Sequence, residues 1–196
     1  MIHHLMCNKR PKTSGMPTIH ARTGRQKQRY VDQFRLVAGC IPYKFDETVQ
    51  TNVLVLMISS PNRDDLVFPK GGWEDDETLV QAARREAMEE AGVQGIVDVG
   101  IIRFYLKMYL WVILRVFDQQ ESPLGTWEFR SKSSERSCNN EGICRGYMFA
   151  LKVTEELEFW PGQTSYVRKW LTIEQASQLC RYDWMREALN RFMSLL

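Results

Sequence analysis

Three glutamates near the middle of the chain, Glu86, Glu89 and Glu90, have the spacing of one helix face. At about 100° per residue they fall within an arc of about 100°, inside a segment, 78–91, that has helical propensity. Carboxylates so close together repel one another, and a bound cation would relieve the repulsion. Hard oxygen donors in this arrangement suit Mg²⁺ or Mn²⁺, which also bind substrate phosphates. The spacing alone leaves two interpretations open, a solvated acidic face and a divalent metal site.

A longer pattern around these glutamates favours the metal site. Residues 71–93 read GGWEDDETLVQAARREAMEEAGV and match G-x5-E-x7-R-E-U-x-E-E-x-G-U, where U is aliphatic. The fixed positions are Gly71, Glu77, Arg85, Glu86, Glu89, Glu90 and Gly92. Chance would produce these seven residues on the order of once in a million chains. The pattern resembles the Nudix box, with Ala87 at a position where a larger aliphatic residue is usual. The resemblance implies an α/β (α+β) fold, an α/β/α sandwich with a mixed central sheet, and hydrolysis of a diphosphate linkage.

The resemblance also implies roles for residues of the box. Glu86, Glu89 and Glu90 match the metal-binding glutamates, with Glu89 or Glu90 as the principal ligand. The expected cofactor, Mg²⁺ or Mn²⁺, lowers the pKa of a bound water and neutralises charge on phosphoryl oxygens. A free carboxylate takes the proton of this water, and which one does so varies within the family. Arg85 is expected to orient a glutamate, with Glu77 as its structural counter-charge. The expected catalytic set is Arg85, Glu86, Glu89 and Glu90.

Residues that flank the box indicate a subfamily. The segments 35–40 (RLVAGC), 68–73 (FPKGGW) and 168–170 (RKW) resemble the diphosphoinositol polyphosphate phosphohydrolase branch, and 23–43 resembles its plant Nudix members. By position, the expected substrate-binding residues are Arg35, Lys70, Gly71, Gly72 and Arg168. The three cations would hold phosphates, although solvated basic residues at strand ends are the alternative interpretation. The two glycines would let the loop before the helix bring backbone groups close to metal and phosphate.

The substrates that this resemblance implies are diphosphoinositol polyphosphates and/or dinucleoside polyphosphates, which are small anionic molecules. ADP-ribose, nucleotide sugars and capped RNA are alternatives, because the box determines the chemistry and not the leaving group. A further alternative is a non-enzymatic ligand-binding protein or an inactive splice product. We expect a monomer with no stable nucleic-acid partner and no membrane association.

Hydrophobic patterns predict the elements that position the box. Strands are expected at 34–43, 53–58, 66–68, 93–99, 126–130, 147–153 and 166–171, and helices at 78–91, from Thr172, and from Asp183 to about Phe192. Gly92 is placed to cap the C-terminus of the first helix. Thr172 and Gln175 have the capping-box pattern, and Asp183 is expected to cap the last helix.

The charges of the chain are unevenly distributed. Its 196 residues have a net charge of only +2, but residues 1–35 carry eight Lys and Arg against Asp32 alone. This part therefore has a charge of +7, and the remaining 161 residues have a charge of −5. The distribution predicts a basic N-terminal arm at 1–33, disordered or transit-like, and a Nudix hydrolase domain at 34–196. We expect a location in the cytoplasm and/or nucleus, with the mitochondrion as the alternative if the arm directs transit.

An apolar segment near 99–120 interrupts the resemblance. It contains Arg103, Lys107 and Arg115, and its longest uncharged run is seven residues, whereas a membrane span requires about 20. The branch normally runs from the strand after the box almost directly to a segment like 125–129. The sequence therefore predicts an insert that arises from alternative or incorrect splicing. Sequencing of transcripts across this junction tests the hypothesis, which fails if every transcript encodes the segment.

Overall fold

The computed structural model describes residues 21–46, 48, 52–59, 63–98, 122–130 and 142–196. Its strands are β1 Tyr30–Val31, β2 Phe34–Phe45, β3 Val53–Ser59, β4 Lys70–Gly72, β5 Val93–Asp98, β6 Gly125–Arg130, β7 Ile143–Glu156 and β8 Val167–Thr172, and its helices are α1 Leu79–Ala91, α3 Ile173–Leu179 and α4 Asp183–Met193. The expected insert near 99–120 and residues 1–20 of the basic arm lie outside the described residues. Within these described ranges, no helix is long and apolar enough to cross a membrane.

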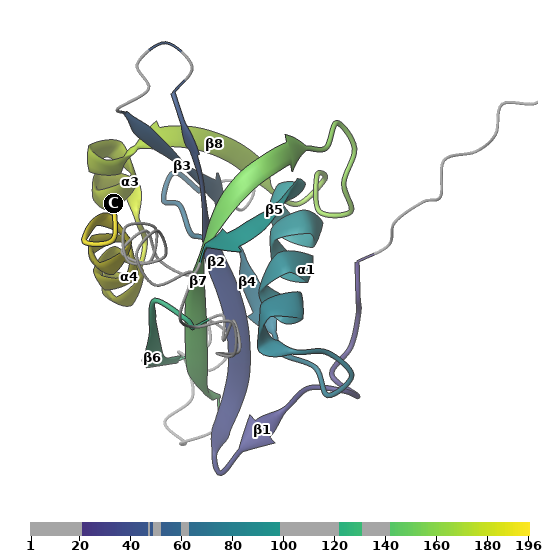
Figure 1. Ribbon diagram of the computed structural model, residues 1–196. Coiled ribbons are helices and arrows are strands. Elements are labelled where there is room, and N and C mark those ends of the chain that lie inside the picture. Colours follow the sequence, from purple (N-terminus) through teal and green to yellow (C-terminus); the bar gives the residue numbers. More distant parts are fainter. Residues whose placement is uncertain (1–20, 47, 49–51, 60–62, 99–121, 131–141) are drawn as a thin grey trace, which may run out of the picture.

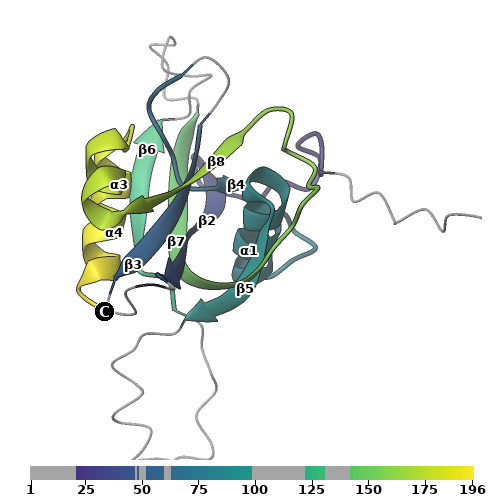
Figure 2. The ribbon, with the colours of Figure 1, turned by 90° about the horizontal axis from the view of Figure 1, so that it is seen from above.

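A mixed sheet lies at the centre of the fold. Its strands follow the order β5-β7-β2-β3-β8, while β1 and β4 also pair with β2, and β6 pairs with β7. Strands β2 and β7 run parallel, from Arg35 opposite Cys144 to Tyr43 opposite Lys152, and the other strand pairs are antiparallel. Helix α1 covers one face of the sheet, and α3 and α4 cover the other (Figures 1 and 2). This arrangement confirms the predicted α/β/α sandwich.

The two helix layers explain the apolar content of the central strands. Residues 36–43 of β2 are all buried, as expected for a strand covered on both faces. On one side, α1 presents small residues, Ala83, Ala87 and Ala91, which are fully buried against the sheet. On the other side, α4 buries Phe192, whose ring lies 5.0 Å from that of Tyr43.

Helix α1 has defined ends that fix the position of the box glutamates. Thr78 is its N-cap, and the side chains of Thr78 and Gln81 form a capping box, which satisfies backbone N–H groups of the first turn. Gly92 ends the helix with φ 64°, and its N–H donates to the carbonyls of Ala87 and Met88. A left-handed residue at this position favours glycine. The predicted helix and its C-cap are therefore confirmed.

Several details of the predicted elements differ from the structure. Leu66 and Val67 form isolated β-bridges rather than a strand. The predicted capping box of α3 at Thr172 is confirmed, whereas the prediction that Asp183 caps α4 was wrong. Tyr182 is the N-cap and has no side-chain capping bond, while Asp183 is the first helical residue and pairs with Arg186.

The segment before the first helix also differs from the prediction. Gly71 and Gly72 belong to β4 and pair with Ala38 and Val37 of β2, so the expected loop before the helix is partly a strand.

Within the basic arm, residues 30–31 form β1 and pair with the start of β2. The arm up to residue 33 was expected to be disordered or transit-like, but its described part, 21–33, is attached to the sheet. Two backbone hydrogen bonds of Arg29 contribute to this attachment. Its N–H donates to the carbonyl of Trp73, and its carbonyl accepts the N–H of Leu36.

Candidate active site

The three box glutamates lie on the face of α1 that is turned toward β4. Glu86 and Glu89 are each only 7% exposed. Burial, and then the negative charge of Glu90, raise the pKa of Glu86 to about 8, although Arg85 opposes this rise. Burial also raises the pKa of Glu89 and of Glu90 above the ordinary carboxyl value. A buried carboxylate cluster whose negative charge is only partly compensated is an environment that a cation stabilises.

Glu90 is held by bonds from two other elements. Its Oε2 accepts the backbone N–H of Lys70 in β4 at 2.8 Å. The hydroxyl of Tyr166, which precedes β8, donates a second bond to the Glu90 carboxylate, and burial followed by this negative charge raises the pKa of Tyr166. The carboxylate is therefore fixed between the helix and the sheet.

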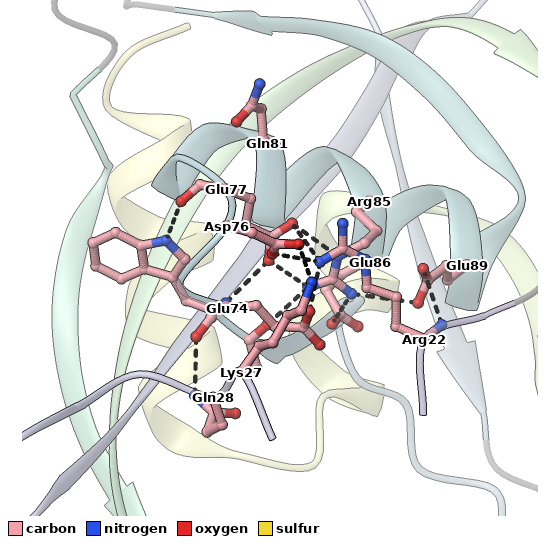
Figure 3. Close-up of polar contacts among 12 residues, drawn as sticks. Arg22, Lys27, Gln28, Glu74, Asp76, Glu77, Gln81, Arg85, Glu86 and Glu89 are labelled. Carbon is pink, nitrogen blue, oxygen red and sulfur yellow. Dashed lines mark hydrogen bonds and ion pairs between the residues drawn. The ribbon is translucent and has the colours of Figure 1, made fainter. Parts of the chain in front are cut away.

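Arg85 connects Glu77, Glu86 and Glu89 to one another (Figure 3). Its Nε and Nη2 donate to the two carboxylate oxygens of Glu77 at 2.9 and 2.8 Å, and Nη1 donates to Glu86 at 2.7 Å and to Glu89 at 3.3 Å. Nη2 also donates to the carbonyl of Gly72 at 2.8 Å. Burial acts to lower the pKa of Arg85, but its bonds with Glu77 and the charge of Glu86 raise it above the usual value. Arg85 thus holds the carboxylates of Glu77, Glu86 and Glu89 in place relative to one another.

Gly71 brings the backbone of β4 against the Glu86 carboxylate. A Cβ at this position would lie 2.2 Å from Oε1 of Glu86, so a larger residue requires the carboxylate to move. At Gly72 a Cβ would lie 2.1 Å from Oε1 of Gln28 and 3.0 Å from Nη2 of Arg35. Both positions therefore depend on close approach rather than on an unusual backbone angle.

The donor chemistry of this cluster fits a divalent cation. As the side chains lie, the described residues contain no group of three or more His, Cys, Asp or Glu that could hold a metal ion. The donors are nevertheless carboxylate oxygens, the ligands that Mg²⁺ and Mn²⁺ prefer. The mutual repulsion of Glu86 and Glu90 favours binding of a positive charge between α1 and β4.

A cavity of about 660 Å³ opens beside Glu90. Arg35, Lys70 and Gly71, which were expected to bind substrate, line it. Its other lining residues include two further cations and three aromatic residues that sequence reasoning missed: Arg130, Arg181, Phe129, Tyr166 and Tyr182. These come from β6, the approach to β8 and the loop before α4, so only the tertiary fold shows that they share a space with Lys70.

The structure places two of the expected substrate-binding residues outside the lining of this cavity. Gly72 packs against Gln28, as described above. Arg168 donates from Nη1 to the carbonyls of Ala91 and Gly92 at 3.3 and 3.1 Å, and its guanidinium lies 4.3 Å from the centre of the Trp160 ring. Arg168 thus binds carbonyls at the C-terminus of α1, a position where a cation stabilises a helix.

The sandwich fold and the glutamate-rich helix define a class of protein, hydrolases that cleave phosphorus-containing anhydrides. The NUDIX domain model matches residues 33–192, and the chain belongs to the Nudix hydrolase family. It is a pyrophosphohydrolase, and Nudix hydrolases generally use divalent metal ions. The prediction of the family from the box is confirmed.

Two relatives from Arabidopsis thaliana are similar over most of the chain. Nudix hydrolase 12, mitochondrial, is 51% identical over 191 residues, which cover 92% of this chain and 83% of the relative. Nudix hydrolase 13, mitochondrial, is 52% identical over 192 residues, which cover 92% and 84%. An Ap4A hydrolase from C. elegans, solved as a binary complex, has a TM-score of 0.52 at 17% identity and covers 81% of this chain and 95% of that one. At this identity the likeness extends to the fold alone.

The names of these relatives correct one expectation. Both are mitochondrial proteins by name, and this finding contradicts the cytoplasm and/or nucleus that we expected. The expectation was wrong because it gave too little weight to the arm, whose basic, acid-poor composition is typical of transit peptides.

Proposed function

We propose that the protein hydrolyses a diphosphate linkage in diphosphoinositol polyphosphates and/or dinucleoside polyphosphates, with Mg²⁺ or Mn²⁺ as cofactor. The observation that carries this proposal is the convergence of four cations and a box glutamate on one cavity: Arg35, Lys70, Arg130, Arg181 and Glu90 line it together. A ligand with several phosphates complements such a site, whereas ADP-ribose offers only its diphosphate. A volume of about 660 Å³ lies within the usual range for small-molecule sites.

The carboxylates of Glu86, Glu89 and Glu90 would hold the cation, with Glu89 or Glu90 as its principal ligand. When bound, a divalent cation lowers the pKa of a coordinated water and neutralises charge on the phosphoryl oxygens. Arg85 orients Glu86 and Glu89, and the bonds from Lys70 and Tyr166 orient Glu90.

Proton transfer requires a carboxylate with sufficient basicity. Burial raises the pKa of Glu86 to about 8, and a bound cation would favour the charged form of this carboxylate, the form that can accept a proton. Glu89 and Glu90 also have pKa values above the ordinary carboxyl value. Substitution of each glutamate in turn distinguishes the carboxylate that acts as the base from those that bind the cation.

Substrate phosphates would be held by Arg35 and Lys70. The guanidinium of Arg35 is fixed because Nε donates to Oε1 of Gln28 at 2.8 Å. The amide nitrogen of Gln28 in turn donates to the carbonyl of Leu36 at 2.8 Å. A cation held in one orientation loses less side-chain entropy when it binds a phosphate.

The experiment that tests this function is a parallel assay, with Mg²⁺ and with Mn²⁺, in which substrate and products are separated by anion-exchange chromatography, because only the diphosphoinositol substrate releases inorganic phosphate. The substrates are a diphosphoinositol polyphosphate, a series of diadenosine polyphosphates, and ADP-ribose. We expect the highest kcat/KM for one or both of the first two classes. Preference for ADP-ribose, or substrate binding with no release of product under either metal, would contradict the proposal.

A further inference from the structure

The loop before α4 places Arg181 at the cavity. An ion pair with Asp65 fixes the orientation of this side chain. Asp65 accepts bonds from Nε and Nη2 of Arg181, at 2.9 and 3.0 Å. The same carboxylate accepts Nε and Nη2 of Arg63, each at 2.8 Å. Two bidentate pairs on one carboxylate restrict the rotation of all three side chains.

The backbone beneath this pair is bonded independently of the side chains. The N–H of Arg181 donates to the carbonyl of Leu66 at 2.8 Å, and the N–H of Leu66 donates to the carbonyl of Leu179 at 2.9 Å. Residues 179–181 are therefore attached to the segment that follows Asp65. Because these bonds involve only backbone atoms, they remain when either side chain is substituted.

Arg181 has donors beyond those that Asp65 occupies. A guanidinium carries five N–H donors, and the two bonds to Asp65 use the edge formed by Nε and Nη2. Tyr182 accepts a further bond from Arg181, and both residues line the cavity. The side chain of Arg181 is only 11% exposed, which is unusual for a cation, so the cavity is where its remaining donors can meet a ligand.

Arg181 and Lys70 reach the same cavity from different elements. Leu66, which is bonded to Arg181, precedes Lys70 by four residues, so the two Cα atoms are at most about 14 Å apart. Lys70 lies beside Glu90, where the scissile linkage is expected. Arg181 therefore offers a charge within reach of the same ligand, in addition to the charge that Lys70 offers beside the reacting bond.

We propose that Arg181, oriented by Asp65, binds a phosphate group of the substrate other than those of the cleaved linkage, so that Asp65 is a positioning residue. This inference rests on the proposed function, since it assigns a second anionic group to the same substrate. The pair thereby favours substrates with several phosphates over those with a single diphosphate.

The test measures binding of inositol hexakisphosphate, which has no diphosphate linkage to cleave, to the full chain by titration calorimetry. We expect Arg181→Gln to weaken binding about 10- to 100-fold, as for loss of a bond to a charged group. Arg181→Lys should recover part of this loss. Asp65→Asn should weaken binding less than Arg181→Gln, because it frees the guanidinium without removing it.

The control is Lys152→Gln, which removes an exposed cation on β7. Lys152 lies eight residues after Cys144, a lining residue, hence about 26 Å away along the strand, and we expect no change in affinity. In steady-state assays Arg181→Gln should raise KM and leave kcat within about twofold, as for loss of uniform binding. An unchanged affinity and KM for Arg181→Gln, or failure of the wild type to bind, would overturn the inference.

The two proposals fail in different ways. If the wild type cleaves polyphosphate substrates and Arg181→Gln does so with the same KM, the inference fails and the proposed function stands. If the wild type cleaves none of them but binds inositol hexakisphosphate in an Arg181-dependent manner, the proposed function fails and the binding site stands. Thermal unfolding of each variant shows whether the fold persists.

Discussion

The backbone N–H of Arg22 donates a hydrogen bond to Oε1 of Glu89 across 3.3 Å, and this bond joins the basic arm to a candidate metal ligand. The side chain of Arg22 keeps the arm in place, because Nη1 pairs with Glu74 and, at 2.8 Å, with Asp76 (Figure 3). The described end of the arm therefore lies directly on the box, with its positive charge on the acidic loop.

Release of this contact should make Glu89 more available to a cation. For Arg22→Ala we expect the Mg²⁺ concentration that gives half-maximal activity to fall about two- to tenfold, the range of one ordinary hydrogen bond. Trypsin should also cleave after Lys27 faster than in the wild type. Lys152→Ala is the control for loss of one cation. An unchanged or higher Mg²⁺ requirement would show that Glu89 does not contribute to metal binding or that the arm does not compete with it.

Substitution of one box glutamate tests the catalytic assignment. Glu90→Gln keeps an oxygen for the N–H of Lys70 but removes the charge, so we expect turnover to fall by orders of magnitude while the fold persists. The increase in Tm on addition of Mg²⁺ should also become smaller, because metal binding stabilises only the folded state. The same loss is expected for Glu89→Gln. Glu158→Gln, on the exposed segment after β7, is the matched control, and unchanged rates in the box variants would refute the assigned roles.

Arg85 is expected to support stability as well as catalysis. Its side chain is 12% exposed and that of Glu77 is 5% exposed, so Arg85→Ala leaves buried carboxylates without their partner. Removal of one member of a buried pair costs about 3–5 kcal/mol, and urea unfolding of the metal-free protein measures this loss. Lys27→Ala, which breaks a pair between exposed side chains, should change stability little. Equal effects of the two substitutions would contradict a buried network.

Gly71→Ala tests the close approach of β4 to Glu86. The added methyl group would meet the Glu86 carboxylate, and overpacking of this kind costs about 1–3 kcal/mol. In a Glu86→Ala background the same substitution should cost much less, because the carboxylate that it meets is gone. A double-mutant cycle of unfolding free energies measures this difference. A coupling energy near zero would show that β4 shifts and that the added methyl group does not press on the Glu86 carboxylate.

The residues that act through local sequence were predictable. The spacing of Glu86, Glu89 and Glu90 on α1, the left-handed cap at Gly92 and the capping box at Thr172 all depend on neighbours a few positions away. The sandwich fold followed from the box through family resemblance and not from periodicity. Helix α4 shows the limit of such signals, because Asp183 has the composition of a cap but lies one residue inside the helix.

The residues that depend on long-range contact were not predictable from the chain alone. Arg181 and Phe129 reach the cavity from elements far apart in sequence, and no local pattern distinguishes them from solvated residues. Arg168 is the opposite case. Its position at a strand end suggested a phosphate-binding role, but in the fold its side chain binds a carbonyl at the end of α1. The strand character of β4 was missed because its pairing with β2, and not its Gly-rich sequence, determines it.

Asp65 should contribute to the pH dependence of stability. Its bonds with Arg63 and Arg181 hold the pKa of this carboxyl well below the usual value. A lowered pKa in the folded state stabilises the protein above the unfolded-state pKa, about 3.9, and this stabilisation is lost as the pH falls toward the folded-state value. We therefore expect the wild type to lose more unfolding free energy than Asp65→Asn between pH 5 and pH 2.5, measured by urea titration. The comparison between the two proteins cancels the contribution of Asp76, whose pKa is lowered to about 2 by its bonds with Lys27 and Arg22. Parallel pH profiles would mean that Asp65 is not paired in solution. The inference that Asp65 orients Arg181 would then be wrong as well.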